Sequence, residues 1–71
     1  MFDKQALRIK MLSCYCSAKE LSQILGISTS ALYRRLNGSV YFTVPEVLRC
    51  ADRLSLTSEE RDQIFFTAGV A

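Results

Sequence analysis

The polar and basic side chains between residues 17 and 38 are the part of this sequence whose types and spacing suggest a chemistry. The stretch reads SAKELSQILGISTSALYRRLNG, and its second half combines hydroxyl groups, an amide and two adjacent arginines. Arginine can donate two hydrogen bonds to a guanine, while serine, threonine and asparagine can bond to several base edges or to a phosphate. The chemistry that this stretch favours is recognition of a nucleic acid.

The composition argues against catalysis and metal binding. The chain has no histidine, so neither a Ser–His nor a Cys–His pair can form. The neighbouring acids Glu59, Glu60 and Asp62 fit the acidic first turn of a helix better than a catalytic pair. Three cysteines without any histidine leave a zinc site without a fourth ligand. We expect free thiols and no enzyme, no metal and no cofactor.

The charge is distributed unevenly along the 71 residues. The net charge is +2, but residues 1–44 carry six Lys or Arg against two acids, whereas residues 45–71 carry three against five. A basic front half suits contact with a polyanion through one side only, and ordinary solvated charge explains the pattern equally well. No apolar run approaches the ~20 residues that span a bilayer, and no signal peptide is visible. We expect one domain over residues 1–71, in the cytoplasm and with no membrane partner.

Helix start signals divide the chain into five segments. Three stretches place a hydroxyl three residues before a glutamate, the pattern of a capping box, at residues 17–20, 43–46 and 57–60. Asp3 and Ser28 can cap two further helices. The expected helices run over about 3–14, 18–25, 29–37, 44–54 and 58–67.

Apolar residues recur every three or four positions in these segments, so each helix has one face to bury. The expected inward residues are Leu7, Met11, Leu12, Tyr15, Leu21, Ile24, Leu25, Leu32, Leu36, Val44, Val47, Leu48, Ala51, Leu54, Ile64, Phe65 and Ala68. The stretch between the third and fourth helices is short, and we expect an extended loop there. The sequence therefore predicts an all-α fold, a compact five-helix domain.

The joint between the second and third helices is very tight. Gly26 stands where a residue with positive φ is needed to end the second helix, and Ile27 and Ser28 complete the turn. Two helices joined so closely cross steeply, as in a helix-turn-helix unit. We expect this unit over about 17–38, with the small Ser22 permitting the close approach of the third helix.

The outward face of the third helix is polar and basic. With Leu32 and Leu36 inward, a rotation of ~100° per residue turns Arg34 almost directly outward. The other residues on this face or at its margins are Thr29, Ser30, Tyr33, Arg35 and Asn37. A helix that reads base edges in a major groove requires such a surface, although two arginines on an exposed helix are commonly only solvated. We favour the DNA-facing role.

Residues 17–38 also resemble the helix-turn-helix of the lambda-repressor and Cro-like regulators, through the stretch ELSQILGISTSALYRRLNG. The later stretch YFTVPEVLRCADRLSLTSEERDQIFF is similar to the fourth and fifth helices of small phage-encoded members from Gram-positive hosts. The resemblance implies a DNA-binding domain that regulates transcription, often at a lysis–lysogeny switch.

The resemblance further implies which residues contact DNA. Thr29, Ser30, Tyr33 and Arg34 match the base-contacting positions, while Asn37 and residues 17–19 match phosphate clamps. Many members have a glutamine where this chain has Ala18, so Ser17, Lys19 or backbone N–H groups must make that contact. The full set of expected DNA contacts is Ser17, Lys19, Ser28, Thr29, Ser30, Tyr33, Arg34, Arg35 and Asn37.

Two functions remain open. The favoured one is a Cro-like repressor that binds double-stranded operator DNA as a homodimer, because one reading helix covers only about four or five base pairs. The dimer or partner surface is expected at the end of the fifth helix and in the tail, through Phe66 and Val70. The alternative is a modulator, a co-repressor or anti-repressor, that binds the main phage repressor. The low net charge of +2 keeps this alternative open.

Overall fold

The computed structural model of the protein describes residues 2–66. This part of the chain contains five α-helices and no strand: α1 (Lys4–Ser13), α2 (Ala18–Leu25), α3 (Thr29–Leu36), α4 (Val44–Arg53) and α5 (Ser58–Phe65). The all-α, five-helix fold predicted from the sequence is confirmed, and each helix begins and ends within two residues of its expected bounds. Across residues 2–66, none of the helices has the length and apolar character needed to cross a membrane.

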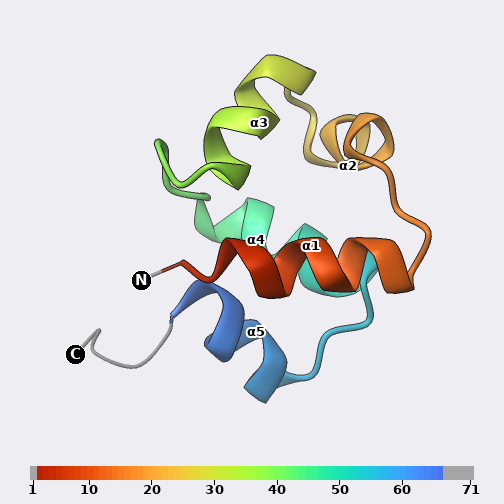
Figure 1. Ribbon diagram of the computed structural model, residues 1–71, viewed down its shortest axis with the longest axis vertical. Helices are drawn as coiled ribbons and strands as arrows, with labels where there is room; N and C mark the ends of the chain where they lie inside the picture. The colour runs from red at the N-terminus through yellow and green to blue at the C-terminus, as the bar shows by residue number, and fades with distance from the viewer. Residues whose placement is uncertain (1, 67–71) are drawn as a thin grey trace.

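The helices divide the molecule into two ends and a middle (Figure 1). The pair α2 and α3 forms one end of the longest axis, and α5 forms the opposite end. Between them, α1 crosses in front of α4. The outer surface of the α2–α3 pair therefore faces away from α5, and the buried sides of all five helices meet between the two ends.

Each helix begins at a capped residue, as the sequence predicts. The side chains that accept the backbone N–H three residues further on belong to Asp3, Ser17, Ser28, Thr43 and Thr57. At Thr43 and Thr57 the glutamate three residues further on accepts the backbone N–H of the capping threonine, so both capping boxes are complete. At Ser17 the box is only half formed, because the carboxylate of Glu20 accepts instead from Arg53 Nε at 2.7 Å.

Four helices are followed by a residue with left-handed backbone conformation. The next residue then donates its backbone N–H to the carbonyl five positions before it. The left-handed residues are Tyr15, Gly26, Gly38 and Ser55, and the returning bonds are those of Cys16, Ile27, Ser39 and Leu56. The sequence identified this ending at Gly26 alone. Two of the remaining turns use a residue with a Cβ, which a glycine signal cannot reveal.

The core joins all five helices. Its buried apolar residues are Leu7, Met11, Cys16, Leu21, Leu25, Leu32, Leu36, Val47, Cys50, Leu54, Ile64 and Phe65. At its edge the rings of Phe2, Phe42 and Phe65 pack together, with centroids 5.2–5.8 Å apart. The three cysteines carry free thiols. Burial raises the pKa of Cys50 to about 12, so this thiol stays neutral and packs as a small apolar group.

Four residues that the periodicity assigned to the core lie on the surface instead: Leu12, Tyr15, Val44 and Leu48. Tyr15 is 91% exposed because it has left α1 and occupies the left-handed turn position. Leu12 lies on the side of α1 away from the core. On α4, the row that turns inward contains Val47 and Cys50, so the adjacent row with Val44 and Leu48 faces outward. Ala68 lies outside the described residues.

Candidate nucleic-acid interface

The turn between α2 and α3 has the geometry that the sequence predicts. Gly26 has φ of 69°, and Ile27 donates its N–H back to the carbonyl of Ser22 at 3.0 Å. Ser22 is buried, and its hydroxyl donates to the carbonyl of Lys19 at 2.7 Å. The small, internally bonded side chain of Ser22 leaves room for α3 to pack directly on α2. This packing fixes the direction in which α3 presents its outer face.

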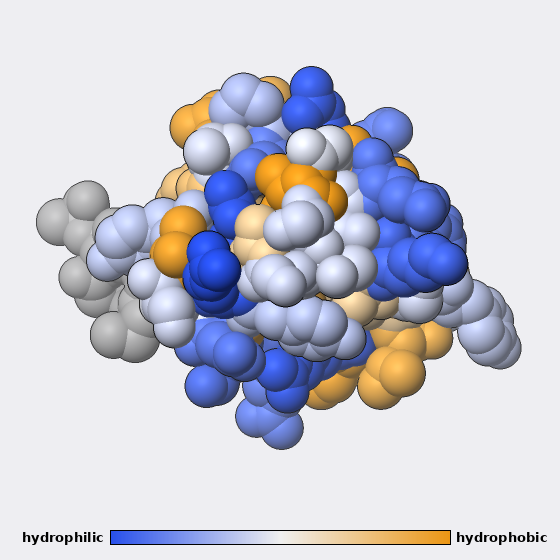
Figure 2. All heavy atoms as spheres, turned by 90° about the horizontal axis from the view of Figure 1, so that it is seen from above, coloured by the Kyte–Doolittle hydropathy of each residue, from blue (hydrophilic) through white to orange (hydrophobic). Residues whose placement is uncertain are grey.

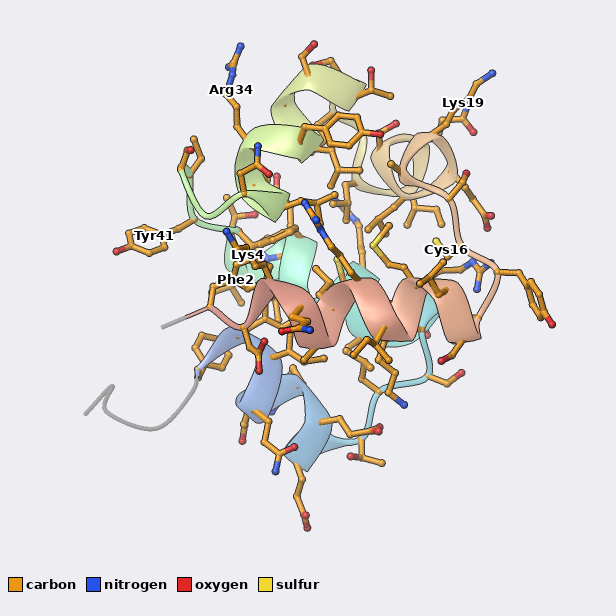
Figure 3. The ribbon with its side chains drawn as sticks, in the orientation of Figure 1. Phe2, Lys4, Cys16, Lys19, Arg34 and Tyr41 are labelled. Atoms are coloured by element: carbon orange, nitrogen blue, oxygen red, sulfur yellow. The ribbon has the colours of Figure 1, made fainter. Side chains whose placement is uncertain are left out.

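The outer face of α3 carries the side chains expected to read bases. Leu32 is fully buried and Leu36 nearly so, which turns the opposite side of the helix to solvent. The exposed residues of this helix and its C-terminal cap are Thr29, Ser30, Tyr33, Arg34 and Asn37. Arg34 points outward at the end of the molecule formed by α2 and α3 (Figure 3). Within residues 2–66 its guanidinium has no carboxylate within ion-pair distance.

Three residues at the starts of α2 and α3 occupy positions suited to phosphate contacts. Lys19 is exposed and points outward at the same end of the molecule as Arg34 (Figure 3). Ser17 and Ser28 are exposed N-caps whose hydroxyl oxygens accept backbone N–H groups at 3.1 and 3.0 Å. Each hydroxyl still has its own proton to donate. The positive end of each helix dipole also favours an anion at these positions.

The side chain of Arg35 is bonded to the start of α4, whereas the sequence predicted that it contacts DNA. Its Nε bonds to Glu46 Oε1 at 2.8 Å, and its Nη1 donates to the carbonyl of Ala31 at 3.2 Å. Glu46 is buried and also accepts the backbone N–H of Thr43 at 2.9 Å. The guanidinium of Arg35 therefore joins α3 to the start of α4. We assign it a structural role and leave it out of the candidate interface.

The acid nearest the start of α2 is also paired. Arg53 on α4 contacts Glu20 Oε2 at 2.7 Å and donates to the carbonyl of Cys14 at 3.4 Å. The hydrogen bond that Arg53 donates to Glu20 raises the pKa of Arg53. This pair places a positive charge beside the only carboxylate of α2, which reduces the repulsion that Glu20 would exert on a phosphate near Ser17 or Lys19.

The pairing of charges distinguishes two classes of cation. Among residues 2–66, four of the nine Lys and Arg side chains form ion pairs: Lys10–Glu60, Arg35–Glu46, Arg53–Glu20 and Arg61–Asp62. The others are Lys4, Arg8, Lys19, Arg34 and Arg49. Figure 2 looks onto the end formed by α2 and α3, where blue hydrophilic side chains surround a pale centre that also shows some orange apolar side chains. Lys19 and Arg34, the cations of the candidate interface, are thus available to a ligand.

One cation beside α3 was missed by the sequence reasoning. Arg8 on α1 is exposed and donates from Nη2 to Asn37 Oδ1 at 3.4 Å, across 29 positions of sequence. Lys4 lies one helical turn before Arg8 on the same side of α1. The sequence shows this spacing, but nothing in it says that α1 passes the C-terminal end of α3.

The comparison with protein families gives an independent result. A family model described as the BetR domain matches residues 7–65, which is most of the chain. The chain belongs to the BetR domain family. This is a small domain family to which a regulatory role is attributed. No curated protein and no solved structure matches the chain.

The BetR domain match covers the structural unit that holds the candidate interface. It starts at Leu7 and ends at Phe65, both of which are core residues. It therefore includes the core-facing part of α1 and the whole of α2, α3, α4 and α5. A regulatory role is compatible with the exposed polar face of α3, although the fold alone does not identify a ligand.

Proposed function

We propose that this BetR domain is a sequence-specific DNA-binding regulator of transcription that places α3 in the major groove of double-stranded DNA. The observation that carries the proposal is the separation of paired from unpaired cations. Arg34 and Lys19 extend from the α2–α3 end without an acid partner in residues 2–66, whereas Arg35 and Arg53 neutralise nearby carboxylates. A groove about 12 Å wide admits one helix, and α3 offers it hydroxyls, an amide and a guanidinium.

The biological setting proposed here is that of a Cro-like repressor. It rests on the resemblance of residues 17–38 to the lambda-repressor and Cro-like regulators, and it implies a phage-encoded protein that acts on DNA in the bacterial cytoplasm. Thr29, Ser30, Tyr33 and Arg34 are the proposed base contacts. Ser17, Lys19, Ser28 and Asn37 are the proposed phosphate contacts.

The dependence of DNA binding on salt tests the phosphate contacts. Each phosphate neutralised by a cation should contribute about −0.9 to the slope of log affinity against log salt concentration. Lys19→Ala should weaken binding to operator and to unrelated DNA alike, and should make that slope shallower by about one unit. Arg61→Ala removes the same charge from α5, at the opposite end of the molecule (Figure 1), and should leave the slope unchanged. A flat salt response of the unmodified protein would exclude a phosphate-dominated interface.

Two copies on a palindromic operator are the proposed binding unit, because one reading helix contacts too few base pairs to specify a genomic site. Phe66 is 51% exposed although its neighbour Phe65 is buried, so its ring is available to a second copy. Val70, the other proposed dimer residue, lies outside the described residues. Phe66→Ala should lower the cooperativity of operator binding and leave helicity largely intact. A titration of operator DNA with the protein and circular dichroism measure the two effects, and an unfolded variant would place Phe66 in the core instead.

A modulator that binds the main phage repressor is the second candidate function. The observation that favours it is a row of exposed apolar side chains along α1, where Ile9, Leu12 and Tyr15 are 56%, 78% and 91% exposed. Their spacing of three residues places them on one side of the helix and the turn that follows. Titrating the pure protein against its own promoter region, with and without the neighbouring repressor, separates the two candidates. A retarded complex with the protein alone supports direct DNA binding.

A further inference from the structure

The C-terminal end of α3 cannot bind a phosphate through its backbone. The N–H of Asn37 donates to the carbonyl of Tyr33 at 2.9 Å, and that of Gly38 donates to Arg35 at 3.0 Å. The next two N–H groups, those of Ser39 and Val40, both donate to the carbonyl of Arg34. This end also carries the negative pole of the helix dipole, which repels an anion. Any phosphate held here must be bound by side chains.

We infer that Arg8 and Lys4 of α1, a helix outside the helix-turn-helix unit, join Asn37 at the end of α3 to form a second binding site for a DNA backbone phosphate. The inference rests on the proposed function and extends it to a helix that the sequence did not connect with DNA. The contact that suggests it joins Arg8 Nη2 to Asn37 Oδ1 at 3.4 Å.

The contact between Arg8 and Asn37 leaves donors free. Arginine has five N–H donors and no acceptor, so the oxygen of the Asn37 amide must face it. The amide NH₂ of Asn37 then points elsewhere, with both protons available. Most of the guanidinium donors of Arg8 are also unused in the described part of the chain. Amide and guanidinium donors that lie side by side match the several oxygen acceptors of one phosphate.

The charges around this site are not neutralised locally. Lys4 and Arg8 are exposed, and no carboxylate of residues 2–66 lies within ion-pair distance of either. Asp3, the acid adjacent to Lys4, uses its Oδ1 to accept the N–H of Ala6 at 3.0 Å and caps α1. By contrast Lys10, on the same helix, is paired with Glu60 at 2.7 Å. Of the three cations of α1, Arg8, which contacts Asn37, and Lys4 have no carboxylate partner among residues 2–66.

The position of the site relative to Arg34 indicates a phosphate rather than a base. Asn37 follows Arg34 by about one helical turn, at the end of the helix proposed to enter the groove. In the view of Figure 3, Lys4 is drawn on the side of α1 toward the α2–α3 end. A helix seated in the major groove has sugar–phosphate backbone at its ends. The site would thus hold the backbone at the C-terminal end of α3, while Lys19 holds it at the start of α2.

Charge-removing variants of α1 test the inference without knowledge of the operator. We would measure the affinity of the full chain for a short random-sequence duplex over a range of salt concentrations, for Arg8→Gln, Lys4→Gln and the matched control Arg61→Gln. Arg8→Gln should make the slope shallower by about 0.9 and weaken binding about tenfold at low salt, and Lys4→Gln should change the slope in the same direction. Arg61→Gln should behave as the unmodified protein. Thermal unfolding of each variant verifies that it is folded.

Two further measurements distinguish a phosphate contact from a purely structural bond between α1 and α3. Arg8→Lys keeps the charge, so it should retain the salt dependence of the unmodified protein. If the Arg8–Asn37 contact were only structural, Arg8→Lys and Arg8→Gln would both disturb it, and both would lower the unfolding temperature. Asn37→Ala combined with Arg8→Gln should cost less than the sum of the single changes, because both bind one phosphate. If Arg8→Gln and Lys4→Gln match Arg61→Gln while the unmodified protein binds the duplex, the site is refuted and the proposed function stands. If the unmodified protein binds no duplex at all, both are refuted.

Discussion

Arg35→Ala should destabilise the domain by about 3 kcal/mol, because it leaves the buried carboxylate of Glu46 without its cation. The pair joins Arg35 Nε to Glu46 Oε1 at 2.8 Å, with 16% and 9% of the two side chains exposed. A domain of this size has about 5 kcal/mol of total stability, so the variant should keep about 2 kcal/mol and unfold at a much lower denaturant concentration than the unmodified protein. Chemical denaturation followed by circular dichroism measures the loss. Arg34→Ala removes the same side chain from the exposed side of α3 and is the matched control.

The pH dependence of stability provides a second measurement on the same pair. Burial alone would raise the pKa of Glu46, but hydrogen bonds from Thr43 and Arg35 and the charge of Arg35 outweigh it and hold the pKa below its usual value of 4.5. A lowered folded-state pKa stabilises the protein above the unfolded-state pKa, and the stabilisation is lost as the pH falls through the folded-state value. The difference in stability between the unmodified protein and Arg35→Ala should therefore be largest near neutral pH and shrink in acid. A difference that does not change with pH would contradict a role for this ion pair.

Arg34→Ala should remove about 1–3 kcal/mol of operator binding and relax the preference at one base position in each half-site. The guanidinium of Arg34 extends outward from α3 (Figure 3) and has no carboxylate within ion-pair distance in the described part of the chain, so its loss should cost little stability. Competition binding to operators altered at single positions measures the change in preference, and thermal unfolding verifies the fold.

The same variant separates the two candidate functions when its affinity for the neighbouring repressor is also measured. Loss of operator binding with repressor binding intact supports direct readout by Arg34. Arginine is also a common anchor of protein interfaces, so loss of repressor binding alone would assign this surface to a protein partner. If the unmodified protein binds the repressor tightly and no operator, the Cro-like function is wrong.

The helices and their starts could be predicted from the sequence because the signals are local. Asp3, Ser17, Ser28, Thr43 and Thr57 each cap the helix that begins at the next residue, and a cap needs only the three residues that follow it. The turn at Gly26 is local in the same way, since only a residue that tolerates positive φ ends the helix there without strain. From these signals and the inward leucines of α3, the sequence also established which side of that helix would face solvent.

The environments of side chains of the same type were decided by the tertiary structure. Arg34 and Arg35 are neighbours of the same type, yet one faces solvent and the other binds Glu46 on α4. Glu20 forms only half of the expected capping box because Arg53, 33 positions away, competes for its carboxylate. Leu48 satisfies the helical period and is nevertheless on the surface, because the rotation of α4 is set by which neighbours it packs against.

The sequence by itself therefore determined an all-α, five-helix domain with a tight α2–α3 joint and a polar outer face on α3. Only the tertiary structure decided which cations remain unpaired and that Arg8 of α1 reaches Asn37 at the end of α3. The physical reason is the distance along the sequence between the residues that each interaction joins. Helix caps and turns depend on bonds between residues a few positions apart, whereas an ion pair or a shared ligand site depends on how helices distant in sequence are packed together.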